Sequence, residues 1–356
     1  MDFPKLFTAG PVYVRQEIRE EMAKQMFSHR SSEYVSLHSG LIPKIQKLLQ
    51  TQNEVFLYAS SATGVWESAA RNCVRKKALS CVNGEFSKRF GEVIKANGKE
   101  VETLEKKPGQ AILPEDLDSA LSTTDADAVS IVHNETSTGV MNPLKGLMKV
   151  CKEYDVTSLV DVVSSVAGAE VDVDKWGIDV CLFSVQKCLG VPPGLSCASV
   201  SEKALKTSES MANKGYYFDM MVLKKYHGKS HYPSTPPIPQ IFALSKSLDF
   251  LFEEGLQNSW ARHRKVSDFV KQRCIKDLKF KLFCDPEYAS QTISCIDTCG
   301  KNSPEILKKM KEKRYIIASG YGPYKETTFR VGNMGNVYMG DVEEMLEVLE
   351  EVVKQF

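Results

Sequence analysis

Two ionisable side chains stand beside apolar runs of the sequence. Asp161 lies inside the run 159–163, and Lys187 follows the strand-like run 179–184 and precedes the turn Pro192-Pro193-Gly194. A buried carboxylate requires a partner, because burial of an unpaired charge is costly. Burial lowers the pKa of a lysine amine and makes it a nucleophile toward carbonyl groups. Lys187 therefore predicts Schiff-base chemistry, while a structural role as a backbone cap is the ordinary alternative for Asp161 taken alone.

A small polar segment, Ser60-Ser61-Ala62-Thr63-Gly64, follows another apolar run and opens a helical pattern. Free backbone N–H groups at a helix N-terminus attract phosphate, so Ser61, Ala62 and Thr63 predict a phosphate cradle. A plain helix N-cap is the alternative. The sequence has no Walker A loop and no G-x-G-x-x-G turn after a strand, which disfavours nucleoside triphosphates and dinucleotides.

One cofactor, pyridoxal 5'-phosphate, fits these three features together. Its aldehyde needs a lysine such as Lys187, its pyridinium nitrogen needs an anion such as Asp161, and its phosphate needs a helix N-terminus. Phe86, which follows Val82-Asn83-Gly84-Glu85, can provide a flat face for the ring. Core packing is the usual role of a single phenylalanine.

The elements that must hold these residues alternate between short apolar runs and amphipathic stretches, which is typical of parallel βαβ units. Ligands of open parallel sheets lie at the carboxyl ends of the strands, where these residues fall. We expect strands at Glu54–Tyr58, Leu79–Val82, Ala128–His133, Ser158–Val162, Asp179–Ser184 and Leu195–Val200. We expect helices at Thr63–Lys76, Phe86–Asn97, Pro114–Leu121, Pro143–Tyr154 and Ser201–Ser210.

The pattern changes after Tyr217. A loop at Tyr226–Pro239 leads into a helix pair at about Gln240–Lys276, and a smaller α+β unit follows. Its expected pieces are strands at Phe280–Cys284, Thr292–Ile296, Tyr315–Ser319 and Thr328–Val331, and helices at Pro304–Arg314 and from Asp341. We therefore predict an α/β protein with an N-terminal segment near the site (residues 1–14), a large cofactor-binding domain (15–245) and a small C-terminal domain (246–356).

The composition disfavours several classes of partner. The 356 residues include 46 Lys+Arg and 45 Asp+Glu, so the formal charge of +1 gives no electrostatic tether to nucleic acid or anionic lipid. The sequence lacks a signal-peptide pattern near its start and a long apolar run, so we predict a cytoplasmic protein without a membrane span. The ten cysteines contain no C-x-x-C pair and are expected to be reduced, and no metal site is expected at the six histidines.

Seven motifs carry a resemblance that covers nearly the whole chain. They are Ala9-Gly10-Pro11, Ser61-Ala62-Thr63, Val82-Asn83-Gly84, the segment His133–Gly139, Val160-Asp161, Ser184-Val185-Gln186-Lys187 with Pro192-Pro193-Gly194, and Phe329-Arg330-Val331-Gly332. By these motifs the chain resembles the class V, fold-type I aminotransferases, in the branch of alanine-glyoxylate and serine-pyruvate aminotransferases. The resemblance implies a large, mainly parallel sheet flanked by helices and a smaller α+β domain.

The resemblance also implies a role for each site residue. Lys187 would form the Schiff base with pyridoxal phosphate, and Asp161 would pair with the ring nitrogen. The other implied contacts are the phosphate at Ala62, Thr63 and Gln186, the ring face at Phe86, the phenolic oxygen near Thr136, the neighbouring subunit's phosphate at Tyr232 and Thr235, and the substrate at Gly10 and Arg330. The physical chemistry agrees for Arg330, because a planar guanidinium can hold a carboxylate with two hydrogen bonds. A homodimer with shared sites is thus implied.

The implied reaction moves an amino group from alanine, serine or aspartate to glyoxylate or pyruvate by a ping-pong mechanism. One alternative is a 2-aminoethylphosphonate-type aminotransferase, which the motifs do not separate. Another is a desulfurase or lyase with the same cofactor, but such desulfurases need a mobile cysteine, and Cys299 is the only loop-like thiol near the second domain. A catalytically silent scaffold is the non-enzyme alternative; it would be expected to have lost Lys187, Asp161 or Arg330, and all three are present.

Overall fold

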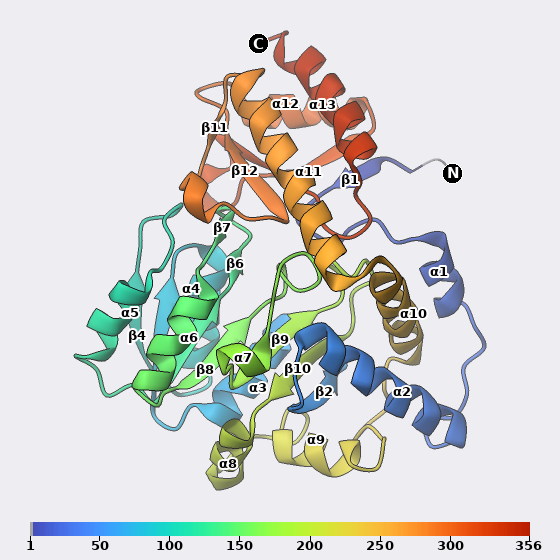
Figure 1. The fold of residues 1–356 in the computed structure, drawn as a ribbon, viewed down its shortest axis with the longest axis vertical. Coiled ribbons are helices and arrows are strands. Elements are labelled where there is room, and N and C mark those ends of the chain that lie inside the picture. The colour runs from blue at the N-terminus through green and yellow to red at the C-terminus, as the bar shows by residue number, and fades with distance from the viewer. Residues whose placement is uncertain (1–2) are drawn as a thin grey trace.

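The computed structural model describes residues 3–356, and the larger of its sheets has seven strands in the order β2-β10-β9-β8-β5-β3-β4 (Figure 1). Strands β4, β3, β5, β8 and β9 run parallel to their neighbours in this series. The strands are β2 (Glu54–Tyr58), β3 (Lys77–Val82), β4 (Glu100–Glu105), β5 (Ala128–Val132), β8 (Thr157–Asp161), β9 (Val180–Ser184) and β10 (Ser196–Val200). The predicted α/β fold with a mainly parallel sheet is confirmed.

Strand β10 departs from the expected parallel pattern, since it pairs antiparallel with both β9 and β2. The connection from β9 to β10 covers residues 185–195 and contains no helix. A parallel neighbour would need a longer crossover, usually through a helix, so the chain turns back instead. This turn carries Gln186 and Lys187, and it keeps both residues at the carboxyl end of β9.

Edge strand β4 was not predicted, because its sequence Glu-Val-Glu-Thr-Leu-Glu has no continuous apolar run. Charged side chains on an edge strand are a common way to prevent pairing with another chain. The two-stranded sheet of β6 (Asn134–Glu135) and β7 (Val140–Met141) was not predicted either, because each of its strands has only two residues.

Helices surround the larger sheet, and three of them, α3, α4 and α8, form one packed layer in which α3 contacts both of the others. Helix α10 contacts α1 and α2 near the N-terminal part of the chain. The helices are α1 (Gln16–Met22), α2 (Ser32–Leu49), α3 (Ala62–Cys73), α4 (Glu85–Ala96), α5 (Pro114–Leu121), α6 (Leu144–Glu153), α7 (Val173–Trp176), α8 (Glu202–Ser210), α9 (Met220–His227), α10 (Ile238–Glu254) and α11 (Leu256–Lys276).

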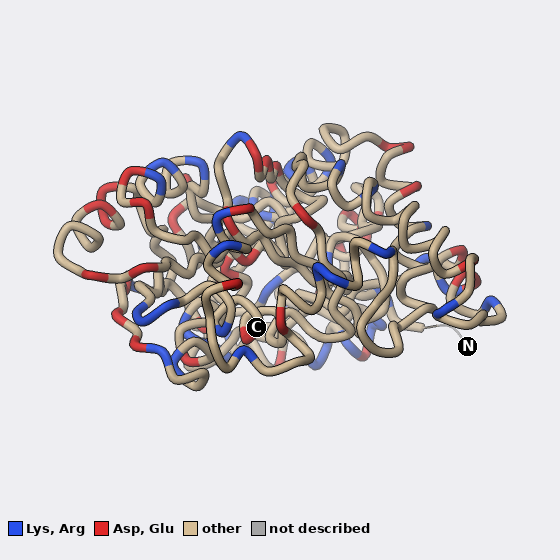
Figure 2. Tube along the Cα trace, turned by 90° about the horizontal axis from the view of Figure 1, so that it is seen from below, with Lys and Arg blue, Asp and Glu red and all other residues tan. Residues whose placement is uncertain are grey.

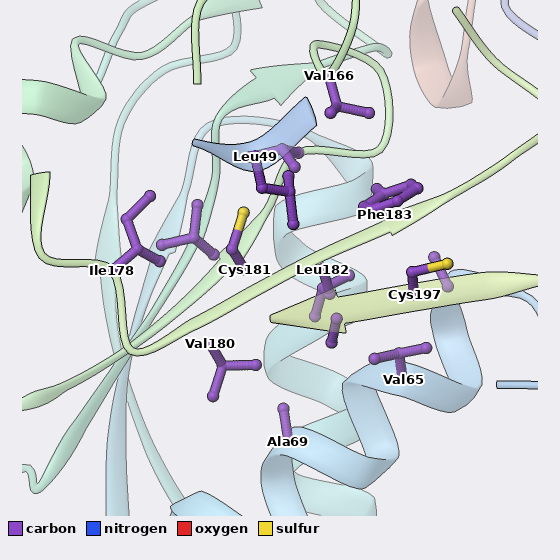
Figure 3. Packing of buried hydrophobic residues seen from close by; sticks show 14 of the residues in the cluster. Leu49, Val65, Ala69, Val166, Ile178, Val180, Cys181, Leu182, Phe183 and Cys197 are labelled. Atoms are coloured by element: carbon purple, nitrogen blue, oxygen red, sulfur yellow. The ribbon is translucent and has the colours of Figure 1, made fainter. Parts of the chain in front are cut away.

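Strand β9 is buried on both faces, as its continuous apolar sequence predicts. Val180 lies on the side of β9 that faces Val65 and Ala69 of α3 (Figure 3). Cys181 and Phe183 point to the opposite side (Figure 3). Packing on both faces fixes β9 in place, and with it the position of the turn that follows.

The second sheet has five strands in the order β1-β13-β14-β12-β11, and helices α12 (Ser303–Glu312) and α13 (Met339–Val353) accompany it. Its strands are β1 (Lys5–Phe7), β11 (Lys281–Leu282), β12 (Ile293–Asp297), β13 (Tyr315–Ser319) and β14 (Thr328–Gly332). Strand β1 pairs parallel with β13, so the N-terminal strand belongs to the sheet of the C-terminal part of the chain (Figure 1). From β1 the chain runs directly into Ala9-Gly10-Pro11.

No helix within residues 3–356 is both long and apolar enough to cross a membrane. Basic and acidic residues are both scattered over the trace in Figure 2, in keeping with the formal charge of +1. All ten cysteines lie in the described part of the chain and are unpaired; nine are buried and Cys299 is exposed. His227 and His231 are four positions apart, but α9 ends at His227, and the described residues contain no metal-binding group of three or more His, Cys, Asp or Glu side chains.

Candidate active site

Asp161 and Lys187, the two ionisable residues beside apolar runs of the sequence, lie at the carboxyl ends of neighbouring strands. Asp161 is the last residue of β8 and pairs in register with Leu182 of β9, and Lys187 follows the end of β9 by three residues. Both side chains line one cavity. The sequence therefore placed the pair correctly, because adjacent parallel strands end at the same edge of a sheet.

Lys187 is enclosed by the segment that leaves β1. Its Nζ donates a hydrogen bond to the carbonyl oxygen of Ala9. A Cβ added to Gly10 would lie 2.5 Å from Cδ of Lys187 and 2.9 Å from its Nζ. Gly10 also has a φ of +89°, in the region that favours glycine. Gly10 thus gives the lysine side chain the room that it occupies.

Asp161 is a buried carboxylate with hydrogen-bond donors to both of its oxygens. Trp66 Nε1 donates to Oδ2 at 2.8 Å, and the backbone N–H of Val163 donates to Oδ1 at 2.8 Å. Burial raises the pKa of Asp161 to about 7, although these two hydrogen bonds and Lys187 act in the opposite direction. A cationic group in the cavity would stabilise the ionised carboxylate, which suits a protonated ring nitrogen.

The pKa of Lys187 moves in the opposite direction. Burial and, to a smaller extent, the positive charge of Arg330 lower the pKa of Lys187 to about 8, while Asp161 partly opposes the change. A substantial fraction of this amine is therefore uncharged just below pH 8. That is the form that attacks a carbonyl carbon.

The N-terminus of α3 forms another wall of the cavity, at Ser61, Ala62 and Thr63. Ser61 occupies the N-cap position, but its side chain makes no capping hydrogen bond to the helix. The observation does not support the alternative of a plain N-cap. Gln186, which accepts a hydrogen bond from Ser184 Oγ at 2.6 Å, lines the same cavity. Backbone N–H groups at a helix N-terminus suit a phosphate group.

Arg330 lies on β14 of the second sheet and reaches the segment that follows β6. Its Nη1 donates to the carbonyl oxygen of Thr136 at 3.0 Å, and its Nε donates to that of Ser319 at 2.9 Å. The guanidinium carbon lies 5.4 Å from the ring centre of Tyr321. Burial lowers the pKa of Arg330 from its ordinary value. The arginine is thus buried but remains a strong cation.

Phe86 and Thr136 are the remaining predicted residues that line the cavity, whereas Arg330 and Gly10 are not among its lining residues. Phe86 lies in the first turn of α4, with its ring centre 5.4 Å from that of Tyr321. Thr136 Oγ1 donates a hydrogen bond to Ser164 Oγ at 3.1 Å. Together with a lysine, a carboxylate and a helix N-terminus, a flat aromatic face and a hydroxyl are the groups that pyridoxal phosphate needs.

Tyr232 and Thr235 are not among the residues that line this cavity. Tyr232 is buried, and its hydroxyl accepts a hydrogen bond from the backbone N–H of Ala59 at 2.9 Å in the same chain. Ala59 lies three residues before Ala62 of the predicted cradle. The reach of Tyr232 and Thr235 to a neighbouring subunit stays a prediction.

Several cavity residues were missed by the sequence reasoning. Trp66 lies one helical turn after Ala62, so the helical spacing of α3 was a usable signal for it. Asn134 and Ser164 follow the ends of β5 and β8, and the strand-end rule could have found them. Arg89 lines the cavity and donates to the hydroxyl of Tyr321 at 2.8 Å, a contact between segments far apart in the sequence.

Comparison with known proteins agrees with this geometry. The family model described as aminotransferase class-V matches residues 11–324. The chain belongs to the class-V aminotransferases. It is a transaminase with the fold of the fold-type I pyridoxal phosphate enzymes.

Individual relatives match this aminotransferase over almost its whole length. It is 33% identical to an uncharacterized aminotransferase of Methanocaldococcus jannaschii, over 98% of this chain and 92% of the relative. It is 31% identical to the serine–glyoxylate aminotransferase of Methylorubrum extorquens, over 93% and 86% of the two chains. The crystal structure of alanine–glyoxylate aminotransferase from Nostoc sp. superposes with a TM-score of 0.94 at 28% identity, over 99% of this chain and 96% of that one.

No cysteine is among the described residues that line the cavity of this aminotransferase. Cys299 is exposed and its Sγ donates to the carbonyl oxygen of Asp297 at 3.8 Å. Cys188 follows Lys187, but its Sγ is directed to the carbonyl oxygen of Ser164 at 3.7 Å. Neither thiol is on the cavity wall, which supports the transaminase reading over a cysteine desulfurase.

Proposed function

We propose that this transaminase holds pyridoxal 5'-phosphate in the cavity between the strand ends and transfers an amino group from a small amino acid to a 2-oxo acid. One observation carries the proposal: Lys187, Asp161 and the N-terminus of α3 line a single cavity. We assign the Schiff base to Lys187, the ring nitrogen to Asp161, the ring face to Phe86 and the phenolic oxygen to Thr136. We assign binding of the phosphate group to Ser61, Ala62, Thr63 and Gln186.

The chain's own residues supply binding, orientation and proton transfer. Pyridoxal phosphate, when bound, supplies an acceptor for the electrons of the substrate Cα–H bond. The freed Nζ of Lys187 would take the proton from the substrate Cα as a base and deliver it to C4′ of the cofactor as an acid. In the second half-reaction the same amine would move a proton in the reverse direction, from C4′ to Cα. Arg330 holds the substrate carboxylate, and Gly10, which gives the Lys187 side chain its room, borders the substrate.

We further propose glyoxylate or pyruvate as the amino acceptor and alanine, serine or aspartate as the donor. Support comes from the names of the relatives, which act on serine or alanine with glyoxylate. Arg330 selects for a carboxylate and leaves the rest of the donor undetermined. The donor must therefore be found by experiment.

A homodimer with shared sites and a division near residue 245 also belong to this proposal. Tyr216 is 62% exposed and Tyr217 is 42% exposed, just before the segment that contains Tyr232 and Thr235, so aromatic surface is available there for a second subunit. Leu251 of α10 belongs to the large hydrophobic cluster and Val266 of α11 to the second cluster, which supports two domains with the division between these two residues, after the predicted residue 245. Unpaired cysteines agree with a cytoplasmic enzyme.

An absorbance spectrum tests the function. Purified wild type and Lys187→Ala are incubated with pyridoxal phosphate, freed of excess cofactor, and then mixed with L-alanine, L-serine or L-aspartate in turn. We expect a visible band in the wild type that Lys187→Ala lacks, and bleaching of that band by one of the donors. A wild type without a visible band after the incubation would refute the proposed function.

A further inference from the structure

A buried carboxylate outside the proposed reaction holds the N-terminus of α4. Glu135 is fully buried. Its Oε1 accepts from the backbone N–H of Phe86 at 3.3 Å, and its Oε2 accepts from that of Ser87 at 2.8 Å. The hydroxyl of Ser137 accepts from the N–H of Glu85 at 3.0 Å and donates to Oε1 of Glu135 at 2.5 Å. The first three N–H groups of α4 thus find acceptors on one distant segment.

The close approach of this segment to α4 depends on Gly84. A Cβ at Gly84 would lie 2.5 Å from Cγ of Glu135 and 2.5 Å from Oγ of Ser137. The φ of Gly84 is 174°, which any residue adopts, so the absence of a side chain is needed for space and not for conformation. A carboxylate at this position also complements the positive end of the helix.

Both ends of this contact lie on the cavity wall. Phe86 lines the cavity from α4, and Thr136, the residue after Glu135, lines it from the other side. The carbonyl oxygen of Thr136 accepts the hydrogen bond from Arg330. Glu135 therefore joins the aromatic face to the segment that orients the carboxylate-binding arginine.

We propose that Glu135 is a positioning residue, which keeps Phe86 against the cofactor ring and keeps Thr136 in place for Arg330. The inference rests on the proposed function, because it takes Phe86 as the ring face. Glu135→Gln preserves the size of the side chain but replaces one oxygen with an NH₂ group, which cannot accept from a backbone N–H. One N–H group of the first turn of α4 then loses its buried partner, and the turn shifts together with the Phe86 ring.

The main test compares Glu135→Gln with Asp127→Asn. The carboxylate of Asp127 also accepts from successive backbone N–H groups, those of Arg75, Lys76 and Lys77, but it is not on the cavity wall. Pyridoxal phosphate binding is followed by the change in tryptophan fluorescence, to which Trp66 contributes from the cavity wall. We expect Glu135→Gln to raise the Kd by about tenfold and also to raise the KM of the amino donor. Asp127→Asn should lower the Tm and leave both constants unchanged.

The background Phe86→Ala separates positioning from a general loss of stability. Without a ring to position, Glu135→Gln should change the Kd of pyridoxal phosphate far less than in the wild-type background. An undiminished effect in the Phe86→Ala background would overturn the proposal. So would a Kd and a KM for Glu135→Gln that match those of Asp127→Asn.

Amide hydrogen exchange tests the tether on the cofactor-free protein. We expect the N–H groups of Phe86 and Ser87 to exchange faster in Glu135→Gln than in wild type, and unchanged exchange would overturn the tether. This measurement does not depend on the proposed function, so a wild type that binds no pyridoxal phosphate would refute that function alone. Should Glu135→Gln fail to fold, Ser137→Ala removes the hydroxyl on Glu135 and predicts smaller changes of the same sign.

Discussion

Gly10→Ala should remove most of the transaminase activity with only a modest loss of stability. The added Cβ would lie 2.5 Å from Cδ of Lys187, and ordinary van der Waals contact begins at 3.4 Å, so the lysine must retreat by about 3.4 − 2.5 = 0.9 Å. A displacement of about 1 Å of a reacting group costs on the order of a hundredfold in rate. The positive φ of Gly10 adds backbone strain of about 1–2 kcal/mol for a residue with a Cβ.

Gly98→Ala is the matched control for this prediction. Gly98 has a φ of +77° and no heavy atom within 4 Å of an added Cβ, so it carries the backbone strain without the clash. The assay is kcat/KM with the donor that bleaches the wild-type band, together with the Tm of each variant. Similar losses of Tm, with a hundredfold loss of kcat/KM in Gly10→Ala alone, are expected. Activity in Gly10→Ala within twofold of Gly98→Ala would refute the argument that Gly10 makes room for Lys187.

Three further predictions concern the pKa of Lys187, the pKa of Asp161 and the ring of Tyr321. Burial lowers the pKa of Lys187 to about 8, so the rate at which pyridoxal phosphate produces its visible band on the cofactor-free protein should rise with pH and level off above about 8. A continued rise of this rate toward pH 10.5 would contradict the prediction. Arg330→Met should move the midpoint of the rise to higher pH. Burial raises the pKa of Asp161 to about 7, so the cofactor-free folded protein binds this proton more tightly than the unfolded chain does. The Tm of wild type should therefore fall relative to that of Asp161→Asn as the pH rises from about 4 to about 7. A constant difference in Tm over this range would contradict the prediction. Tyr321→Ala removes the ring beside Arg330 and should raise the KM of the amino donor by about tenfold. Tyr321→Phe keeps the ring but loses the hydrogen bond with Arg89, and should change this KM by less than about threefold. Equal effects of the two variants on the KM would refute a role for the ring.

The sequence predicted the central elements well, because their signals are local. Strand β9 was predicted at 179–184 and found at Val180–Ser184, and helix α5 was predicted and found at Pro114–Leu121. Strand β1 has only three residues and forms a strand by pairing with β13, more than three hundred positions away, so it was not predicted. Helices α1 and α2, which precede the first predicted strand, were not predicted either, although α2 has an apolar face and a proline inside it at Pro43.

The residues of the site also differ in whether a local signal in the sequence could predict them. Lys187, Asp161 and Ala62 follow strands of one sheet, so a local rule about strand ends was enough to bring them together. Tyr321 and Arg89 come from segments 232 positions apart, and their contact depends on how the second sheet sits over α4. Glu135 was quoted within a motif, but its function as a cap of α4 requires the turn of β6 and β7 to lie against Gly84. Such long-range contacts leave no periodic signal in the sequence.

Burial brings the pKa values of both Lys187 and Asp161 closer to neutral pH. It lowers the pKa of the amine to about 8 and raises that of the carboxyl to about 7, so both groups exchange protons near neutral pH. A residue that must act as a base in one step and as an acid in another works best with a pKa close to the working pH. The charge of Arg330 contributes to the low pKa of Lys187, and a substrate carboxylate on Arg330 would offset that charge. In the proposed mechanism, a substrate carboxylate bound to Arg330 would therefore raise the pKa of Lys187 when Lys187 takes the proton from Cα.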